Sequence, residues 1–425
     1  MLRSLAAHAD RRGLPAPVAL AGDWFDSAAV LAPEVRLTPI TAAQAFPPAP
    51  APAPASARHG ADTGSPVVGG GWIGRLDYPD APDSAIDAPE PGAAGPGPEP
   101  AEGYGGWADA VLRLSHDGCW WYESLTDRPC PEHWRAAVTG PAPDPRPWHI
   151  DWQAPDHAAH LTAIDRCLTA IADGTISQAC ICTAFTGTAH GAPLEFFVDA
   201  VAATAPTKAA FLPAAGATVA SLSPETFLRR TGRAVLSRPI KGTVPATTDP
   251  AVLRASDKER AENLLITEAV RTELDTVAEP GTARATELLA LRRAPGVWHL
   301  VSTVEARLRP EVTDQALVAA TFPPSSVTGL PRDRARALIT EWEARARGAY
   351  CGVLGMVSPL AGLDSSVAVR TAEFGPGGAV TLGVGGGITA SSRPADEWQE
   401  CLDKAAGVIE TSATACRRGA DPIDH

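Results

Sequence analysis

Beyond residue 150, apolar and polar residues recur at the spacing of amphipathic helices in several stretches. This pattern predicts helices over residues 157–174, 256–274 and 334–347, and a fourth helix that begins near Ser392. Ser256 opens the second stretch and is a candidate N-cap, because a serine oxygen accepts a hydrogen bond from a free backbone amide there. Four helices are therefore expected in this part of the chain.

Shorter apolar runs between the predicted helices are typical of β-strands. We expect strands over residues 178–185, 217–223 and 234–240, and earlier in the chain over 67–78. Residues 111–122 alternate around Asp-Gly and predict a hairpin. Strands that come in runs, interrupted by a few helices, favour an α+β sandwich over a repeating βαβ fold.

Two segments of biased composition interrupt the first third of the chain. Residues 47–66 are rich in proline and alanine, and residues 81–103 are rich in proline, glycine and aspartate. Such composition favours extended or mobile chain, so we expect two mobile inserts. We therefore divide the chain into an N-terminal region, residues 1–150, and a second domain, residues 151–416.

Composition and charge exclude several classes of partner. The chain has 425 residues, 45% of them apolar, and a formal net charge of −13. This charge argues against binding to nucleic acid, because no broad basic face would neutralise phosphates. No apolar run reaches 18 residues and the N-terminus lacks a signal-peptide core, so we expect no membrane span and a cytoplasmic protein. The eight cysteines form no C-x-x-C pair, which indicates scattered reduced thiols.

A few charged residues stand in unusual places. Lys241 follows a proline and an isoleucine and precedes a glycine, and it is either a solvated surface charge or a nucleophile in a pocket. Glu397 and Glu400 share a helix face with Lys404, a pattern more typical of a salt-bridged surface. If Glu400 and Glu262 meet from their separate helices, two carboxylates without histidine or thiol suit Mg²⁺ better than zinc.

Three further features carry candidate chemistry. The glycines at 385–387 follow a predicted strand, and their amides in a tight turn would cradle a carboxylate. Arg370 lies in a predicted strand, where a charge needs an anionic partner. His299 has apolar neighbours and is either a core residue or part of a site. Residues 69–74 fit G-x-G-x-x-G, but no helix can follow, so we reject a dinucleotide site.

These segments, in this order, resemble the family of chorismate-utilising enzymes, which includes anthranilate, aminodeoxychorismate, isochorismate and salicylate synthases. The resemblance covers residues 150–412. It rests on S-L-S-P-E-T-F (221–227), R-P-I-K-G-T (238–243), E-N-L-L-I (262–266), H-L-V-S-T-V (299–304), F-P-P-S-S-V-T-G-L-P (322–331), R-G-A-Y-C-G (347–352), V-A-V-R-T (367–371) and the segment 385–400 that ends in E-W-Q-E.

The resemblance implies an α+β fold, a two-layer α/β sandwich of the anthranilate synthase component I type, with the active site in the cleft between two β-sheets. It implies a Mg²⁺ cofactor held by Glu262 and Glu400, with Glu397 beside them, and a general acid at Glu225. It places His299, which lines the ring, among the catalytic residues. It also implies a set of residues that bind chorismate: Thr243, Ser326, Tyr350, Arg370, Gly385, Gly386, Gly387 and Lys404.

Lys241 distinguishes branches of the family. Anthranilate synthases typically carry alanine at this position, whereas the aminodeoxychorismate branch carries lysine. The resemblance therefore implies covalent catalysis by Lys241 and formation of 4-amino-4-deoxychorismate for p-aminobenzoate synthesis. No G-x-C-x-G surrounds a cysteine, so ammonia is expected from a separate glutamine amidotransferase subunit. Anthranilate, 2-amino-2-deoxyisochorismate or isochorismate formation is the alternative within the family.

The chain also departs from the family pattern. Glu268 and Glu273 replace shorter acidic residues, Ser325 replaces a glycine and Arg332 replaces a lysine. A further departure, at Ala246, removes an arginine. These changes are the support for a second alternative, a non-catalytic chorismate-binding paralogue.

The segment that corresponds to the regulatory segment of tryptophan-sensitive relatives is A-P-T-K-A, residues 205–209. It lacks the aromatic residue of those relatives. We therefore expect no feedback by tryptophan.

Overall fold

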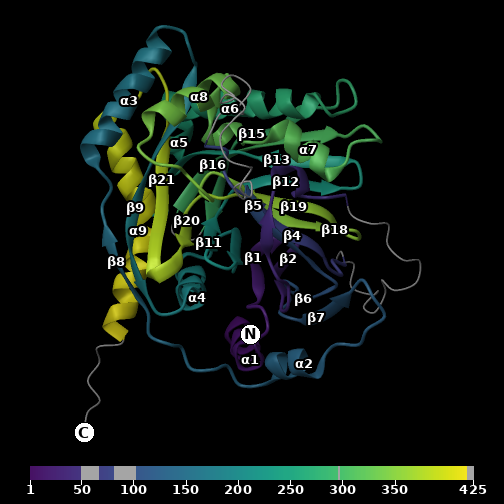
Figure 1. Ribbon diagram of the computed structural model, residues 1–425. Helices are drawn as coiled ribbons and strands as arrows, with labels where there is room; N and C mark the ends of the chain where they lie inside the picture. The colour runs from purple at the N-terminus through teal and green to yellow at the C-terminus, as the bar shows by residue number, and fades with distance from the viewer. Residues whose placement is uncertain (49–66, 81–101, 295–296, 419–425) are drawn as a thin grey trace, which may run out of the picture.

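Two antiparallel β-sheets form the centre of the computed structural model, which describes residues 1–48, 67–80, 102–294 and 297–418 (Figure 1). The strands of sheet 1 lie in the order β17 (Gly329–Leu330), β9 (Gln178–His190), β21 (Ala379–Ile388), β20 (Thr371–Phe374), β11 (Thr218–Ser223), β10 (Lys208–Leu212), β1 (Val18–Trp24), β2 (Ser27–Ala32), β6 (Ala110–Leu114) and β7 (Trp120–Ser124), and β8 (His149–Gln153) pairs with β9.

Sheet 2 combines strands from all parts of the chain. Its order is β14 (Ile240–Pro245), β16 (Val297–Arg307), β13 (Ala234–Arg238), β12 (Thr226–Thr231), β19 (Gly362–Val367), β18 (Val353–Ser358), β4 (Gly71–Leu76), β5 (Gly103–Ala108) and β3 (Thr38–Ile40), and β15 (Arg284–Ala294) pairs with β16.

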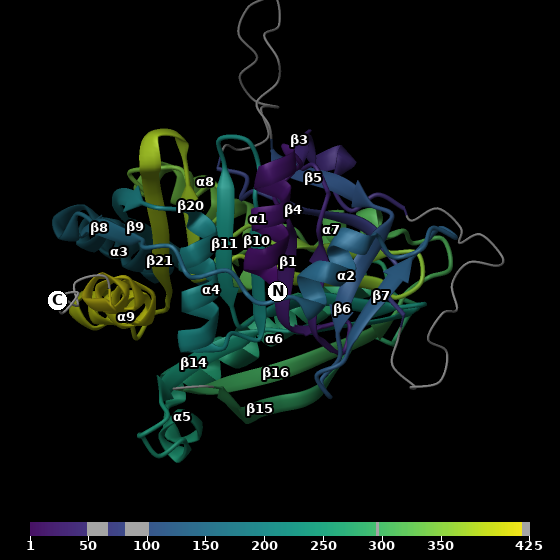
Figure 2. The same cartoon turned by 90° about the horizontal axis from the view of Figure 1, so that it is seen from below.

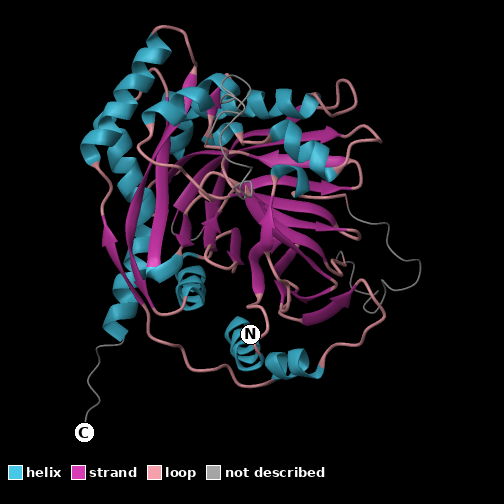
Figure 3. Ribbon diagram, viewed as in Figure 1, coloured by secondary structure: helices cyan, strands magenta, loops and turns pink. Residues whose placement is uncertain are grey.

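Helices lie at the top, left and bottom of the two sheets in the view of Figure 3. The α-helices described are α1 (Leu2–Arg12), α2 (Glu132–Thr139), α3 (His157–Ala172), α4 (Pro193–Thr204), α5 (Ala251–Ala255), α6 (Asp257–Asp275), α7 (Asp314–Thr321), α8 (Arg332–Trp342) and α9 (Pro394–Arg418). Short 3-10 helices span Ala42–Gln44, Ser325–Val327 and Pro376–Gly378.

Apolar side chains from both sheets pack against each other and hold the sandwich together. Leu20 and Leu212 of sheet 1 share one buried cluster with Ile73, Leu354 and Met356 of sheet 2, and all five are excluded from solvent. Burial of this apolar surface is the main force that keeps the sheets face to face. The α+β class and the sandwich expected from the sequence are therefore confirmed.

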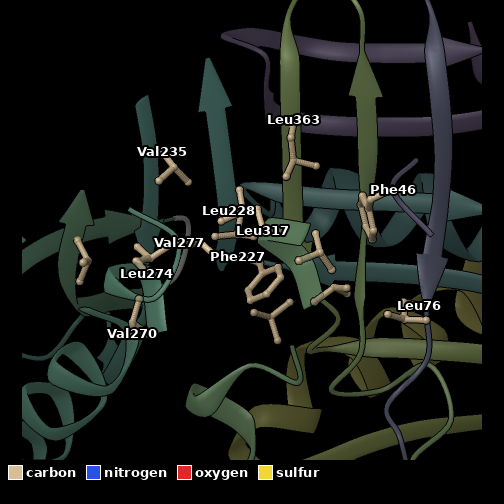
Figure 4. Packing of buried hydrophobic residues seen from close by; sticks show 14 of the residues in the cluster. Phe46, Leu76, Phe227, Leu228, Val235, Val270, Leu274, Val277, Leu317 and Leu363 are labelled. Atoms are coloured by element: carbon tan, nitrogen blue, oxygen red, sulfur yellow. The ribbon is translucent and has the colours of Figure 1, made fainter. Parts of the chain in front are cut away.

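Helices cover the outer faces of the sandwich with further apolar clusters. Figure 4 shows Phe227 and Leu228 of sheet 2 near Val270 and Leu274 of α6 and Leu317 of α7. On the other side, α3 and α9 lie beside β9 and β21 of sheet 1 (Figure 2). The helices α6 and α9 also contact each other, since Lys258 of α6 pairs with Glu397 of α9 at 2.6 Å.

Most predicted elements are present, with local differences. Ser256 caps α6, since its side chain accepts a hydrogen bond from the amide of Glu259. The hairpin at 111–122 is formed by β6 and β7. The helix predicted over 334–347 ends at Trp342, because Glu343 turns inward to accept the Cys182 amide and pairs with Arg347 at 2.6 Å.

Each sheet contains strands from before and from after residue 150. In sheet 1, β1 pairs with β10, and in sheet 2, β4 pairs with β18. The two predicted inserts lie almost entirely outside the described residues, although Gly103 already begins β5. The G-x-G-x-x-G segment runs into strand β4, in agreement with the rejection of a dinucleotide site.

Two remaining expectations concern membranes and thiols. No helix within the described ranges is long and apolar enough to cross a membrane. The cysteines whose side chains are described, Cys119, Cys130, Cys167, Cys180, Cys182, Cys351 and Cys401, are all free thiols.

Candidate active site

A cavity of about 120 Å³ lies in the cleft between the two sheets. Sheet 2 lines it through β14 and β16, sheet 1 through β21, and α6 and α9 close its sides. The site residues predicted from the sequence that line this cavity are Glu225, Lys241, Thr243, Glu262, His299, Ser326, Tyr350, Arg370, Gly385, Gly386, Gly387, Glu400 and Lys404. Among the predicted site residues, Glu397 alone is absent from its wall.

Lys241 projects from β14 into this cavity and is not a surface lysine, since 9% of it is exposed. Its Nζ lies 2.7 Å from Oε1 of Glu262 on α6. Burial by itself would lower the pKa of Lys241, but the charge of Glu262 outweighs it, and the pKa lies above its usual value. The amine is therefore protonated while Glu262 keeps its negative charge.

Carboxylates from two helices meet beside Lys241. Glu262 comes from α6 and Glu400 from α9, and the charges of both act on Glu259, whose pKa burial and these neighbours raise to about 7. Oε1 of Glu262 is buried and receives no aligned hydrogen bond. Clustered carboxylate oxygens are suited to a hard divalent cation, so this set fits the Mg²⁺ that the family resemblance implies.

Two lysines flank the carboxylates. Lys404 pairs with Glu400 at 2.7 Å and donates a hydrogen bond of 2.7 Å to the carbonyl of Gly385. Lys258 pairs with Glu397 at 2.6 Å, behind the cavity wall. Glu397 is 1% exposed and its Oε2 has no partner, so it lies next to the set without facing the cavity. Its role as a direct metal ligand stays a prediction.

Glu225 has the environment of a proton donor. It follows β11 and precedes β12, and it is buried. Burial raises its pKa to about 7, although a hydrogen bond from Ser326 and the charge of Lys241 act in the opposite direction. A carboxyl that holds its proton near neutral pH can act as a general acid, which is the role that the family resemblance implies for this residue.

The far wall of the cavity carries a neutral imidazole and an arginine. Nδ1 of His299 lies 2.8 Å from Oγ1 of Thr243, its partner across β14 and β16, and Nε2 is buried without a partner. Burial and the charge of Arg370 lower the pKa of His299 to about 3, so the ring is neutral. Arg370 lies in a bend between β19 and β20, not within a strand, and forms no ion pair with the described residues. A free guanidinium on the wall suits an anionic ligand.

The glycines at 385–387 lie inside strand β21 and pair with β9, so the prediction of a tight turn is wrong. Their function in packing is to leave room for the site. A Cβ at Gly387 would lie 1.9 Å from Oε1 of Glu262, and one at Gly386 would lie 3.0 Å from Oε2 of Glu397. At Gly383, which lies two residues before Gly385, a Cβ would lie 2.1 Å from the ring of Tyr350.

Sequence reasoning missed Glu259, which belongs with Glu262 and Glu400 to one group of acidic side chains, here called the carboxylate cluster. The signal was present, because Glu259 precedes Glu262 by three residues as Glu397 precedes Glu400. Residues three apart share a helix face, so the repeated spacing places two carboxylates of each helix on the same side. Lys258, which neutralises Glu397, was also missed and carries no sequence signal of its own.

This chain is similar to known proteins in sequence and in structure. The family described as chorismate binding enzyme matches residues 71–410. Aminodeoxychorismate synthase component 1 of Klebsiella aerogenes is 39% identical over 238 residues, which cover 54% of this chain and 52% of that protein. Anthranilate synthase component 1 of Arthrobacter globiformis is 33% identical over 277 residues, which cover 62% of this chain and 51% of that protein. The chain spans about half the length of the curated relatives it matches.

Solved structures share the fold. The menaquinone-specific isochorismate synthase MenF of Escherichia coli superposes with a TM-score of 0.70 at 20% identity, over 97% of this chain and 90% of that one. Anthranilate synthase component I of Streptococcus pneumoniae gives a TM-score of 0.67 at 21% identity, over 83% of each chain. The expected fold type is thus confirmed. Because the family match extends over most of the sequence, the chain belongs to the chorismate binding enzymes.

Proposed function

We propose that this chain is the chorismate-aminating component of an aminodeoxychorismate synthase, which forms 4-amino-4-deoxychorismate from chorismate and ammonia. The observation that carries the proposal is Lys241, whose amine projects into the cavity beside the carboxylate cluster and in the same cavity as Glu225. Relatives named aminodeoxychorismate synthase component 1, at 34–39% identity, support the same reaction.

Glu262 and Glu400 would hold Mg²⁺, with Glu259 and Glu397 next to them. Bound there, the ion would neutralise these carboxylates and hold a carboxylate of the substrate. Arg370 is free to bind the second carboxylate, which explains how an acidic chain can bind a dianion. Neutral His299 would line the ring through its unpaired Nε2.

Lys241 and Glu225 would share the first half of the reaction. The amine of Lys241 bonds to C2 of the ring, the ring double bond shifts, and the C4–O bond breaks as Glu225 donates a proton to form water. Attack requires a neutral amine, and the charge of Glu262 opposes it, so Lys241 is reactive only while that charge is compensated. Ammonia then bonds to C4, the double bond shifts back, and the C2–N bond to Lys241 breaks.

Ammonia would be supplied by a separate glutamine amidotransferase subunit, as the designation component 1 of several relatives suggests. The decisive experiment is product analysis by mass spectrometry after the purified chain is mixed with chorismate, Mg²⁺ and ammonium at mildly alkaline pH. We expect an aminated product that retains the enolpyruvyl group. Lys241→Ala should abolish this product, or slow its formation strongly, while the protein stays folded.

Other products would contradict the proposal. Anthranilate or isochorismate would move the chain to another branch of the family and leave Lys241 unexplained. A normal amination rate in Lys241→Ala would contradict the covalent mechanism. No turnover, even with an amidotransferase subunit and glutamine, would favour a non-catalytic chorismate-binding protein.

A further inference from the structure

Three of the departures from the family pattern touch one another. Oε1 of Glu273, near the end of α6, accepts a hydrogen bond of 2.5 Å from the hydroxyl of Ser325 and one of 3.2 Å from Arg332. The side chain of Glu273 is 14% exposed and that of Arg332 is 23% exposed. These substitutions therefore form one connected cluster that reaches from the interior to solvent.

This cluster borders a second cavity, located behind the active site. Its volume is about 10 Å³, the lower limit for one water molecule. The polar side chains around it include Glu225 and Ser326, which also line the active site, and Glu273 and Ser325 on the other side. Phe227, among others, supplies an apolar wall. Glu225 thus faces two cavities, one that receives substrate and one that leads to Glu273.

The reaction proposed above requires a source of protons for Glu225. In each turnover Glu225 gives one proton to the departing hydroxyl, which leaves as water. Ammonia attacks as the neutral molecule and ends as a protonated amine, and Lys241 leaves with the proton count it started with. Glu225 therefore ends each cycle as a carboxylate and must take a proton from outside, while substrate or product fills the front cavity.

We propose that Glu273 is a proton-relay residue that restores the proton of Glu225 through one water in the second cavity. This inference rests on the proposed amination. Glu273 passes its proton to the water, the water passes one to Glu225, and Glu273 takes another from solvent at its exposed edge. Arg332 and Ser325 hold the carboxyl in position for both transfers.

The acidities of the two carboxyls agree with this path. Burial raises the pKa of Glu273 to about 7, despite the nearby charge of Arg332, and burial raises the pKa of Glu225 to about 7 as well. Proton transfer between groups of similar pKa has little energetic cost in either direction.

The test uses Glu273→Gln in the full chain, with single-turnover and steady-state amination of chorismate measured separately. Below pH 7, where Glu225 starts protonated, the first turnover should keep the wild-type rate. Steady-state kcat should fall about tenfold or more, and KM for chorismate should fall with it, so that kcat/KM stays unchanged. Glu273→Asp, which keeps a carboxyl, should lose less. Glu268→Gln, on the exposed face of the same helix, is the matched control and should keep both rates.

A second variant tests the path without removing a carboxyl. Val270 lines the second cavity, and Val270→Ile adds a methyl group that would displace the water. It should slow steady-state turnover and spare the first. If Glu273→Gln slows the first turnover as much as the later ones, or leaves both unchanged, the relay is wrong. If wild type forms no aminated product, the proposed function itself has failed.

A separate cluster of possible metal ligands lies at the edge of sheet 1. His149 on β8 pairs with His190 at the end of β9, and Asp151 follows His149 by two residues on the same face. One ligand atom from each residue lies within 4.8 Å of the others, and all three side chains are exposed. The rings of His149 and His190 are stacked, with their centroids 4.3 Å apart.

We infer that His149, His190 and Asp151 bind a transition-metal ion such as Zn²⁺. Imidazole nitrogens and a carboxylate suit this class of metal, and small rotations of exposed side chains would bring the ligand atoms to bonding distance. The ion would link the edge strand β8 to β9. No residue of the active-site cavity takes part.

Calorimetric titration of the full chain with Zn²⁺, in excess Mg²⁺ to occupy the glutamate cluster, tests this inference. We expect one site per chain that is lost in His149→Ala and in His190→Ala. His116→Ala, at another exposed histidine, should bind as wild type does. The inference would be overturned if zinc binding persists in both His149→Ala and His190→Ala, or if the wild-type chain does not bind zinc.

Discussion

Gly387→Ala should disable the active site while the fold persists. The backbone of Gly387 is ordinary extended chain, so alanine meets no backbone strain. Its Cβ, however, would lie 1.9 Å from Oε1 of Glu262 and 3.1 Å from Nζ of Lys241. Since ordinary contacts begin at 3.4 Å, the carboxylate of Glu262 must move by about 1.5 Å. Metal–ligand distances tolerate about 0.2 Å, so the displaced oxygen would no longer be a ligand.

The expected effect on activity is larger than the effect on stability. Crowding of this kind costs about 1–3 kcal/mol of unfolding free energy. Loss of a metal-binding contact should weaken Mg²⁺ affinity by at least about tenfold to 100-fold, with a parallel loss of amination. Mg²⁺ affinity by calorimetry, turnover by product analysis and unfolding in urea measure the three quantities.

Gly407→Ala provides a matched control on α9, the helix of Glu400. The nearest atom to a Cβ at Gly407 is Cγ2 of Thr204 at 3.9 Å, so the change should be harmless or slightly stabilising. Wild-type Mg²⁺ affinity and turnover in Gly387→Ala would refute the placement of Glu262 against β21, and with it the assignment of Glu262 as a ligand.

Further outcomes follow from the buried charges. The pKa of Glu225 is about 7 in the folded protein and 4.5 in the unfolded chain. Its contribution to stability is therefore full below pH 4.5 and is lost as the pH rises through 7. The variant Glu225→Gln cannot titrate at this position and lacks this pH dependence. The unfolding free energy of Glu225→Gln, measured relative to that of wild type, should therefore rise by about 3 kcal/mol between pH 4.5 and 7.5. A difference between the two proteins that stays constant over this pH range would contradict the burial of Glu225. Lys208→Met should cost about 3–5 kcal/mol in urea unfolding, because Lys208 and Asp364 form a fully buried pair at 2.6 Å; a loss below 1 kcal/mol would show that Arg229 alone compensates Asp364. Residues 205–209 direct Lys208 into the interior over Trp24, so calorimetry should detect no tryptophan binding, and a tight complex would contradict this. Chelation of Mg²⁺ should abolish turnover, and addition of Mg²⁺ should restore it.

The sequence by itself determined the features that depend on near neighbours. Ser256 is a cap because its oxygen reaches an amide three residues later, and the hairpin at 111–122 follows from its alternation and its turn. The short motifs also identified most of the cavity wall, from Glu225 to Lys404, because each motif carries its residues in a fixed local order. None of this required knowledge of how distant segments pack.

Only the tertiary structure decided where those local pieces meet. The glycines at 385–387 are strand residues because β9 pairs with them. Gly387 has no room for a side chain because Glu262 arrives there from α6, more than a hundred residues earlier in the chain. Likewise, α8 ends at Trp342 because Glu343 bonds to β9. Glu273 gains its position from Ser325 and Arg332, and it lines the second cavity together with Glu225. Such contacts depend on the packing of whole sheets and helices, which no local spacing in the chain records.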